Sequence, residues 1–451
     1  MMSPKKKKEK SELAFSTDNP DLGILGPLEA LFGKFDELEL VDMTIDVDEL
    51  EVIVPPGAGA GMSNEARQFL AQNAIAVQQF AQQMLAALGV QAQLPTGQSA
   101  MPIPAIPVPT RPADLIKARF KAPLTEYSGQ IREITLGATK GNGGSRSKTI
   151  TVGGHKSPAW NLFQSPPKHP PVVAADVFDM RIKLAKAVRL HYDDVMDDPV
   201  DWARLVIDKF GADFITYHMI STDPLLKDTS AKEAMKGFEN ILQAVKVPII
   251  VGGSGDPARD AEVLAMAAEV AEGERVLLAS ATVDMWEPVA KAAKAHDQLV
   301  LSWTSIDINE QKELNRRLLD YITPDQIIID PTTAALGYGA EYSFTIMERM
   351  RLAGIMGDEE LQFPLSSGTT NAWAAREAWM KKPELGPREL RGPIWESTTA
   401  LMFLLAGVDI FMMMHPAAIK TVHDLISWLS TRIDRKREDF VDWTKLALPT
   451  N

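Results

Sequence analysis

Short apolar segments that end in polar residues recur from about residue 172 onward, and helical sequence separates them. Several are continuous apolar runs, which is typical of parallel strands covered on both faces of a sheet. The pattern predicts an eight-fold β/α (TIM) barrel, an α/β fold whose functional groups lie at the carboxyl ends of its strands. The predicted strands are 172–178, 214–219, 247–251, 276–279, 298–303, 327–329, 363–365 and 409–414.

Signals for helix starts follow several of these strands. Asp198-Pro199 and Asp256-Pro257 each place a capping residue before a proline at the first helical position. Ser230 and Glu233 have the spacing of a capping box. Helices are therefore predicted between the strands, as a barrel requires. We expect the barrel to occupy residues 172–435, followed by a C-terminal tail at 436–451.

The sequence before the barrel falls into parts of different character. A charged and acidic segment (1–56) precedes an Ala/Gln-rich stretch (57–100) whose apolar residues have helical spacing. A proline-rich linker follows at 101–122. These three parts predict a separate N-terminal extension used in assembly, with plain disorder as the alternative. Within 123–171, two strand-like runs around a glycine-rich turn predict a hairpin that caps the N-terminal end of the barrel.

Composition narrows the function. The chain has 451 residues and a net charge of -13, which argues against nucleic acid or an anionic membrane as the main partner. It has no cysteine, so it cannot ligate an iron–sulfur cluster through thiolates or use a thiolate nucleophile. The apolar run 401–414 is too short to cross a bilayer, and the N-terminal lysines lead into no apolar signal core. We therefore expect a cytoplasmic protein.

The candidate binding residues stand at predicted strand ends. The densest group is Ser366-Ser-Gly-Thr-Thr-Asn371, whose side chains could contact a ligand or cap the loop. The turn Val251-Gly-Gly-Ser-Gly255 precedes a capped helix, so its backbone N–H groups could hold an anion or simply form the turn. The predicted cofactor-binding residues are Ser366, Ser367, Gly368, Thr369, Thr370, Asn371, Gly253, Ser254, His218, Asp307, Asn309, Asp330, Thr332, Thr333 and His415.

Structural roles remain open for several of these residues. Asp307 also suits a helix N-cap, Asp330 suits a turn before proline, and His218 and His415 could each be structural. No metal-ligand spacing, phosphate-loop lysine or nucleophile elbow is present in the sequence. We therefore predict neither catalytic residues nor metal ligands on this chain.

A series of motifs, in order along the chain, closely resembles one family. It is the delta (small) subunit of the corrinoid iron–sulfur protein in the acetyl-CoA decarbonylase/synthase (CO dehydrogenase/acetyl-CoA synthase) complex. The similarity runs from about Glu126 to about Leu429, and the first 120 residues show no comparable match. The motifs are 137–140, 143–147, 151–154, 329–333, 336–343, 346–352, 366–373 and 391–396.

The resemblance implies a barrel paired with a larger gamma subunit that carries an iron–sulfur cluster and a corrinoid (cobamide) domain. The pair would carry a methyl group on cobalt between a methyl-tetrahydropterin and the nickel site of acetyl-CoA synthase. Carbon monoxide dehydrogenase and a methyl-tetrahydropterin methyltransferase are further implied partners. The corrinoid would lie at the interface with the partner subunit, because this chain lacks an Asp-x-His-x-x-Gly corrinoid pattern. The isolated chain is then expected to lack catalytic activity.

Two other functions stay open. The barrel could itself bind methylated pterin and catalyse transfer, with Asp307, Asn309 and Asp330 holding the pterin. Alternatively, it could be a non-catalytic scaffold that only orients the gamma subunit.

Overall fold

A computed structural model describes residues 124–161, 164 and 167–430 of the chain. The predicted segments 1–56, 57–100 and 101–122 and the tail 436–451 lie outside these residues, so their predictions stay untested. Among the described helices, none combines the length and apolar character that crossing a membrane requires.

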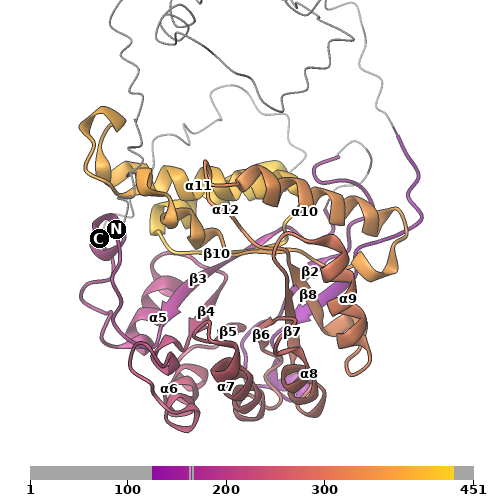
Figure 1. Ribbon diagram of the computed structural model, residues 1–451, viewed down its shortest axis with the longest axis horizontal. Coiled ribbons are helices and arrows are strands. Elements are labelled where there is room, and N and C mark those ends of the chain that lie inside the picture. The colour runs from indigo at the N-terminus through magenta and orange to yellow at the C-terminus, as the bar shows by residue number, and fades with distance from the viewer. Residues whose placement is uncertain (1–123, 162–163, 165–166, 431–451) are drawn as a thin grey trace, which may run out of the picture. The chain divides into compact units, whose positions relative to one another are not determined.

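Eight parallel strands form the predicted barrel (Figure 1). Their order around the sheet is β8-β7-β6-β5-β4-β3-β10-β9. A bridge between Ile329 and Leu365 joins the two ends, and the Ile329 N–H donates to the Pro364 carbonyl at 3.0 Å. The α/β barrel prediction is thereby confirmed. The strands are β3 (Val172–Phe178), β4 (Phe214–His218), β5 (Ile249–Gly252), β6 (Leu277–Ala281), β7 (Leu299–Trp303), β8 (Ile327–Asp330), β9 (Ser366–Ser367) and β10 (Ile410–Met413).

The seventh strand begins later than the apolar pattern predicts. The predicted strand covers 363–365, whereas β9 consists of Ser366 and Ser367, which pair with Ile410 and Phe411 of β10. The first two hydroxyl residues of the polar motif are therefore part of the barrel wall. This placement matters for the site, because residues of the barrel wall already pair with a neighbouring strand.

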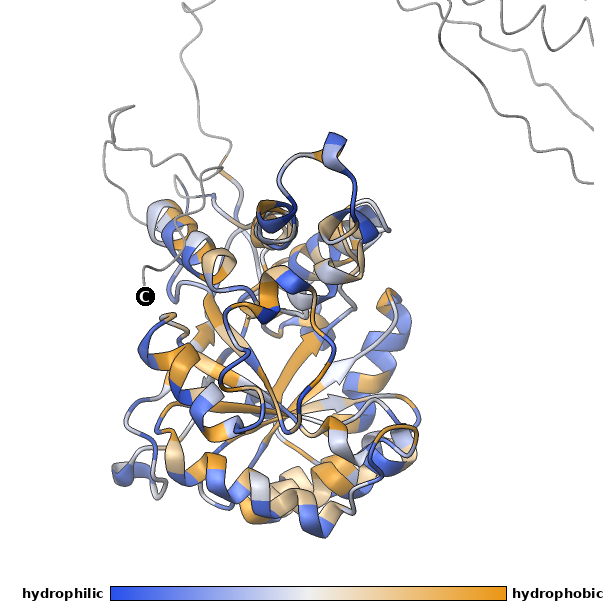
Figure 2. Ribbon diagram, turned by 90° about the vertical axis from the view of Figure 1, so that its left-hand side faces the viewer, coloured by the Kyte–Doolittle hydropathy of each residue, from blue (hydrophilic) through white to orange (hydrophobic). Residues whose placement is uncertain are grey.

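Helices surround the barrel and turn their apolar faces toward it. Figure 2 shows the hydrophobic strands at the centre, ringed by helices that carry both hydrophilic and hydrophobic residues. The Asp256 carboxylate caps α7 by accepting the Arg259 N–H at 2.8 Å, as the sequence predicts. The helices are α4 (Lys186–Arg189), α5 (Pro199–Asp208), α6 (Ala231–Ala244), α7 (Pro257–Val270), α8 (Trp286–Ala295), α9 (Ile308–Leu319), α10 (Ala340–Ile355), α11 (Arg388–Ala406) and α12 (Pro416–Ser430).

The antiparallel hairpin of β1 (Glu133–Leu136) and β2 (Ile150–Gly153) lies against the N-terminal end of the barrel. Arg146, in the turn between them, is buried and donates to the carbonyls of Val245 and Leu242, both at 2.7 Å. Those carbonyls precede β5. The predicted hairpin therefore exists, and it anchors to the segment that enters a barrel strand.

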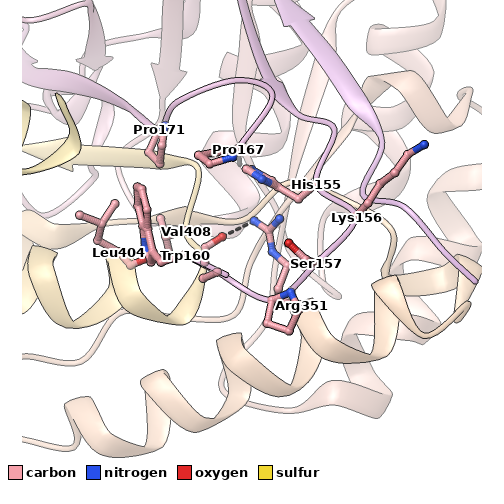
Figure 3. Close-up of a pocket in the computed structure, with 12 residues that line it drawn as sticks. His155, Lys156, Ser157, Trp160, Pro167, Pro171, Arg351, Leu404 and Val408 are labelled. Carbon is pink, nitrogen blue, oxygen red and sulfur yellow. Dashed lines mark hydrogen bonds between the residues drawn. The ribbon is translucent and has the colours of Figure 1, made fainter. Parts of the chain in front are cut away.

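A cluster of charged residues lies at the same end, between the segment after β2 and the start of β10, and Figure 3 shows two of its members, His155 and Arg351. Asp409 lies 2.6 Å from Arg351 and 2.7 Å from His155, and it also accepts the Leu365 N–H at 2.9 Å. Burial opposes ionisation of Asp409, but Arg351 and His155 outweigh it and hold the pKa of its carboxyl below the usual value. The cavity here measures only about 20 Å³, so it leaves room for little more than one water molecule.

Candidate functional site

A cavity of about 420 Å³ opens at the carboxyl ends of the barrel strands. This is the end at which barrel enzymes place their functional groups. No cluster of possible metal ligands occurs among the described residues. The lining consists of Thr216, His218, Ile220, Gly252, Gly253, Ser254, Gly255, Pro257, Asp260, Ala279, Ser280, Thr282, Met285, Leu301, Trp303, Asp330, Thr333, Gly368, Asn371 and Met412.

An imidazole–carboxylate pair forms one side of this mouth cavity. His218 Nε2 lies 3.2 Å from Oδ1 of Asp176, a carboxylate that stands in the middle of the apolar strand β3. The Phe178 ring stacks on the imidazole, with centroids 4.9 Å apart. Position 252 must be glycine, because a Cβ there would lie 2.6 Å from His218 Nδ1. The imidazole is thus held in place, and His218 lines the cavity.

A buried carboxyl group, Asp330, lies at the end of β8 and also lines the cavity. It accepts the Ser366 hydroxyl at 3.0 Å and the Thr332 N–H at 2.9 Å. Burial raises the pKa of Asp330 to about 6, because these two hydrogen bonds only partly replace the lost water. This carboxyl group can therefore exchange a proton near neutral pH, which is a property of many functional sites.

The hydroxyl-rich motif is largely occupied by its own contacts. Ser367 Oγ lies 2.9 Å from Thr333 Oγ1 and 2.8 Å from Thr369 Oγ1, and Thr370 donates to Asp176. Ser366, Ser367 and Thr369 are fully buried. From the motif, only Gly368 and Asn371 line the cavity. The hydroxyls therefore tie strand ends together and are not open to a ligand.

The glycine-rich turn after β5 already holds an anion from this chain. The Asp260 carboxylate accepts the N–H of Ser254 at 2.7 Å and that of Gly255 at 2.8 Å. A Cβ at Gly253 would lie 2.3 to 2.5 Å from the same carboxylate. The predicted anion cradle therefore exists, but Asp260 fills it, and an external anion would have to displace this carboxylate.

The remaining predicted residues make structural contacts outside the cavity. Asp307 caps α9 by accepting the N–H of Asn309 at 2.8 Å, and the Asn309 side chain is exposed. Thr332 donates its hydroxyl to the Thr304 carbonyl at 2.7 Å. His415 is buried, which lowers its pKa to about 3, and it accepts the Ala417 N–H at the start of α12. The pterin contacts considered for Asp307 and Asn309 therefore have no counterpart in the geometry of the mouth cavity.

Two cavity residues that are not among the predicted binding residues carry hydroxyls without a partner. Thr216 Oγ1 and Thr282 Oγ1 are buried, and neither has a hydrogen-bond partner in the described part of the chain. Buried polar groups are normally paired, so such atoms in a cavity wall indicate a place for a ligand or water. Strand alternation was the available signal for Thr216, because it lies two residues before His218 on β4 and hence on the same face.

Taken together, the cavity offers two hydroxyls that have no partner among the described residues, an amide, an imidazole–carboxylate pair and a carboxyl group that titrates near neutral pH. Its volume lies in the range typical of small-molecule sites. Such a set can bind a polar, flat heterocycle by hydrogen bonds and can hold or release a proton beside it. The lining residues include serine, threonine, histidine and aspartate but neither cysteine nor lysine.

Comparisons with known proteins identify relatives of the whole barrel. The family model described as the CO dehydrogenase/acetyl-CoA synthase delta subunit matches residues 133–382. The acetyl-CoA decarbonylase/synthase complex subunit delta of Archaeoglobus fulgidus is 53% identical over 381 residues, covering 81% of this chain and 84% of its own. Subunit delta 2 of Methanosarcina acetivorans is 48% identical over 433 residues, covering 93% and 98%.

Among solved structures, a dihydropteroate synthase from Coxiella burnetii in complex with pteroic acid aligns with a TM-score of 0.41 and 14% identity, covering 58% of this chain and 94% of its own. The level of identity to the delta subunits, sustained over most of both chains, is far more specific. It shows that the chain belongs to the family of delta subunits of the acetyl-CoA decarbonylase/synthase complex.

Proposed function

We propose that this chain and a gamma subunit together carry a methyl group between a methyl-tetrahydropterin and the nickel site of acetyl-CoA synthase. The corrinoid would be borne by the gamma subunit and would lie over the mouth cavity. The observation that carries the proposal is the cavity itself, a polar hollow at the functional end of the barrel with two unpaired hydroxyls. Membership in the delta-subunit family supplies the complex in which it works.

Exposed apolar side chains around the mouth fit a partner-borne group. Leu225 is 92% exposed and Leu226 is 61% exposed in the loop after β4, while Tyr338 and Tyr342 are exposed after β8. Apolar side chains this exposed, near the rim of a cavity, are typical of an interaction surface. We infer that a large macrocycle and its carrier domain cover these residues.

In this function, the exposed apolar residues of the rim and the polar residues of the cavity have different roles. A bound corrinoid would supply the cobalt that accepts and donates the methyl group. The apolar rim residues would contact the macrocycle and exclude water from the reacting atoms. Asn371 and His218 would offer an amide and an imidazole to polar groups that enter the cavity. These residues bind and position, and none of them forms a covalent bond to the methyl group.

The first test is reconstitution with the gamma subunit under anaerobic conditions. The change Asn371→Trp narrows the mouth at an exposed position, so the barrel and the heterodimer should survive it. Methyl transfer from methyl-tetrahydropterin to cobalt should fall at least 10-fold. Arg204→Trp, on the exposed face of α5, is the control and should leave transfer unchanged. Full activity of the Asn371 variant would instead support the scaffold-only function.

A second candidate function rests on a specific observation inside the cavity. Thr216, Thr282 and Asp330 present two hydroxyls and one carboxyl group to the same hollow, and a pterin ring has matching donors and acceptors. We propose as the alternative that the barrel itself binds the methylated pterin. His218, held by Asp176, would then be placed to protonate the amine that leaves when the methyl group departs.

Isothermal titration of the isolated chain with methyl-tetrahydropterin separates the two functions. If the barrel binds pterin, Thr216→Val should weaken binding about 5-fold, because one hydrogen bond contributes about 1 kcal/mol. Valine keeps the shape of threonine, so packing is preserved. If the wild-type chain binds no pterin while the heterodimer transfers methyl groups, the second candidate is excluded and the first stands.

A further inference from the structure

A second hollow adjoins the mouth cavity on the far side of the end of β10. Its volume is about 580 Å³. Met412 lines the mouth cavity, and Met414 lines this groove. Likewise, Asn371 lines the mouth cavity, and Trp373 lines the groove. Two separate chain segments therefore run from one hollow to the other. The groove is lined by Lys183, Leu184, Ala185, Lys186, Val188, Trp373, Trp379, Arg388 and Met414.

Three basic side chains line the groove and have no carboxylate partner among the described residues. Lys183, Lys186 and Arg388 form no ion pair with any described residue, whereas nearby Arg181 lies 2.8 Å from both Asp193 and Asp197. Arg388 donates its Nε to the Trp379 carbonyl at 2.6 Å, which orients the guanidinium group without neutralising it. Unpaired basic side chains that line a concave surface favour an anionic ligand.

Helix α11 adds to the positive potential of the groove. Arg388 is its first residue, and no side chain caps the free N–H groups of its first turn. The helix is 19 residues long, so its N-terminal dipole is fully developed. Glu389 also belongs to this first turn, but it is not among the residues that line the groove.

Two indole rings give the groove an aromatic wall. Trp373 donates Nε1 to the buried Glu396 carboxylate at 2.9 Å and stacks on His415, with centroids 5.9 Å apart. Gly392 makes room for it, since a Cβ there would lie 2.1 Å from the indole. Trp379, in contrast, is 41% exposed. One ring is thus rigid and the other is free to cover a ligand, which suits stacking against an organic group.

We propose that this groove binds the anionic tail, a phosphate or carboxylate, of the same molecule whose ring system occupies or covers the mouth cavity. The inference rests on the proposed function. Two molecules in that function carry such a tail: the tetrahydropterin, and the corrinoid with its nucleotide-loop phosphate. The groove residues Lys186 and Arg388 bind the anionic group, and Trp379 covers the tail.

The test compares ligands with and without the tail on the full-length chain. The pterin arm uses a tetrahydropterin with its acidic tail and 6-methyl-tetrahydropterin without it. The corrinoid arm uses cobalamin and cobinamide, which lacks the nucleotide-loop phosphate and base. The double variant Lys186→Gln/Arg388→Gln removes two charges from the groove. Arg189→Gln/Arg204→Gln removes two charges from positions that are paired with Asp193 and Asp201 instead.

The groove variant should weaken binding of the tailed member of one arm at least 10-fold and leave its tailless partner unchanged. Loss in the pterin arm would assign the groove to the substrate, and loss in the corrinoid arm would assign it to the cofactor. The proposal would be overturned if the groove variant and the control variant weakened binding equally. It would also be overturned if the wild-type chain bound the tailed and the tailless ligand equally well in both arms. A wild-type heterodimer that transfers no methyl group would overturn the proposed function whatever the tail result.

Discussion

Both ends of the barrel bury an acidic group, but the surroundings shift the pKa of the two groups in opposite directions. At the N-terminal end, Asp409 has Arg351, His155 and a backbone N–H as partners, and the pKa of its carboxyl is held low. At the mouth, Asp330 has only hydroxyl and N–H donors, and burial raises its pKa to about 6. The N-terminal end balances the negative charge of Asp409 with positive groups, whereas the mouth leaves the protonation of Asp330 sensitive to pH near neutrality.

The two carboxyl groups also differ in the volume of the cavity beside them. The cavity beside Asp409 measures about 20 Å³, while the one beside Asp330 measures about 420 Å³ and includes the unpaired hydroxyl of Thr216. Dense packing and paired charges stabilise the fold at the closed end. Open space and unused polar groups cost stability at the mouth, which is the usual sign of a functional site. Substitutions at the two ends should therefore have opposite effects.

The largest effect is expected when the closed end loses a charge. Arg351→Met would leave Asp409 buried with only His155 to balance it, and breaking a buried pair costs about 3–5 kcal/mol. Urea denaturation monitored by circular dichroism would measure this loss. Lys420→Met, which removes the exposed pair with Asp424, should change stability by less than about 1 kcal/mol. A small effect at Arg351 would show that the two ends do not differ in this way.

A pH-dependent effect of intermediate size is expected at the mouth. The folded-state pKa of Asp330 lies above its unfolded value of 3.8, so burial favours the neutral form. Its stabilising contribution is present below pH 3.8 and is lost as the pH rises through about 6. Asp330→Asn mimics the neutral form, so its stability relative to wild type should increase by about 2 kcal/mol between pH 4 and pH 8. Equilibrium unfolding across that range measures the difference, and a flat profile would contradict the assigned pKa.

The fold could be predicted because the barrel repeats one simple pattern. Continuous apolar runs and Asp-Pro caps mark strands and helices locally, and these local signals agree with the final structure at Val172–Phe178 and at α7. The exception is β9, whose apolar lead-in at 363–365 suggests a strand three residues too early. A two-residue strand is defined by its neighbours, and neighbours are not visible in a local pattern.

The site could be predicted only by region, because strand-end position does not reveal hydrogen-bond partners. His218, Asp330 and Asn371 do line the mouth cavity, as their positions suggested. The Asp260 carboxylate, however, reaches back from α7 to fill the glycine turn, and the Ser367 hydroxyl is paired with Thr333 of the loop after β8 and with Thr369. Such contacts join residues that are distant in sequence or depend on side-chain direction, so residue type and spacing alone do not predict them.

The smallest effect is expected from the unpaired hydroxyl at the mouth. Thr216→Val removes a buried polar atom that has no partner among the described residues, so the variant should be more stable than wild type by about 1 kcal/mol. Thermal and urea unfolding of the ligand-free chain would measure this gain. Ser302→Ala is the matched control, because the hydroxyl of Ser302 on β7 donates to the amide oxygen of Asn315 on α9 at 2.8 Å, and its loss should destabilise the fold. If both variants lose stability equally, Thr216 is an ordinary wall residue. A gain at Thr216 alone would show that the mouth gives up stability to keep a hydroxyl available.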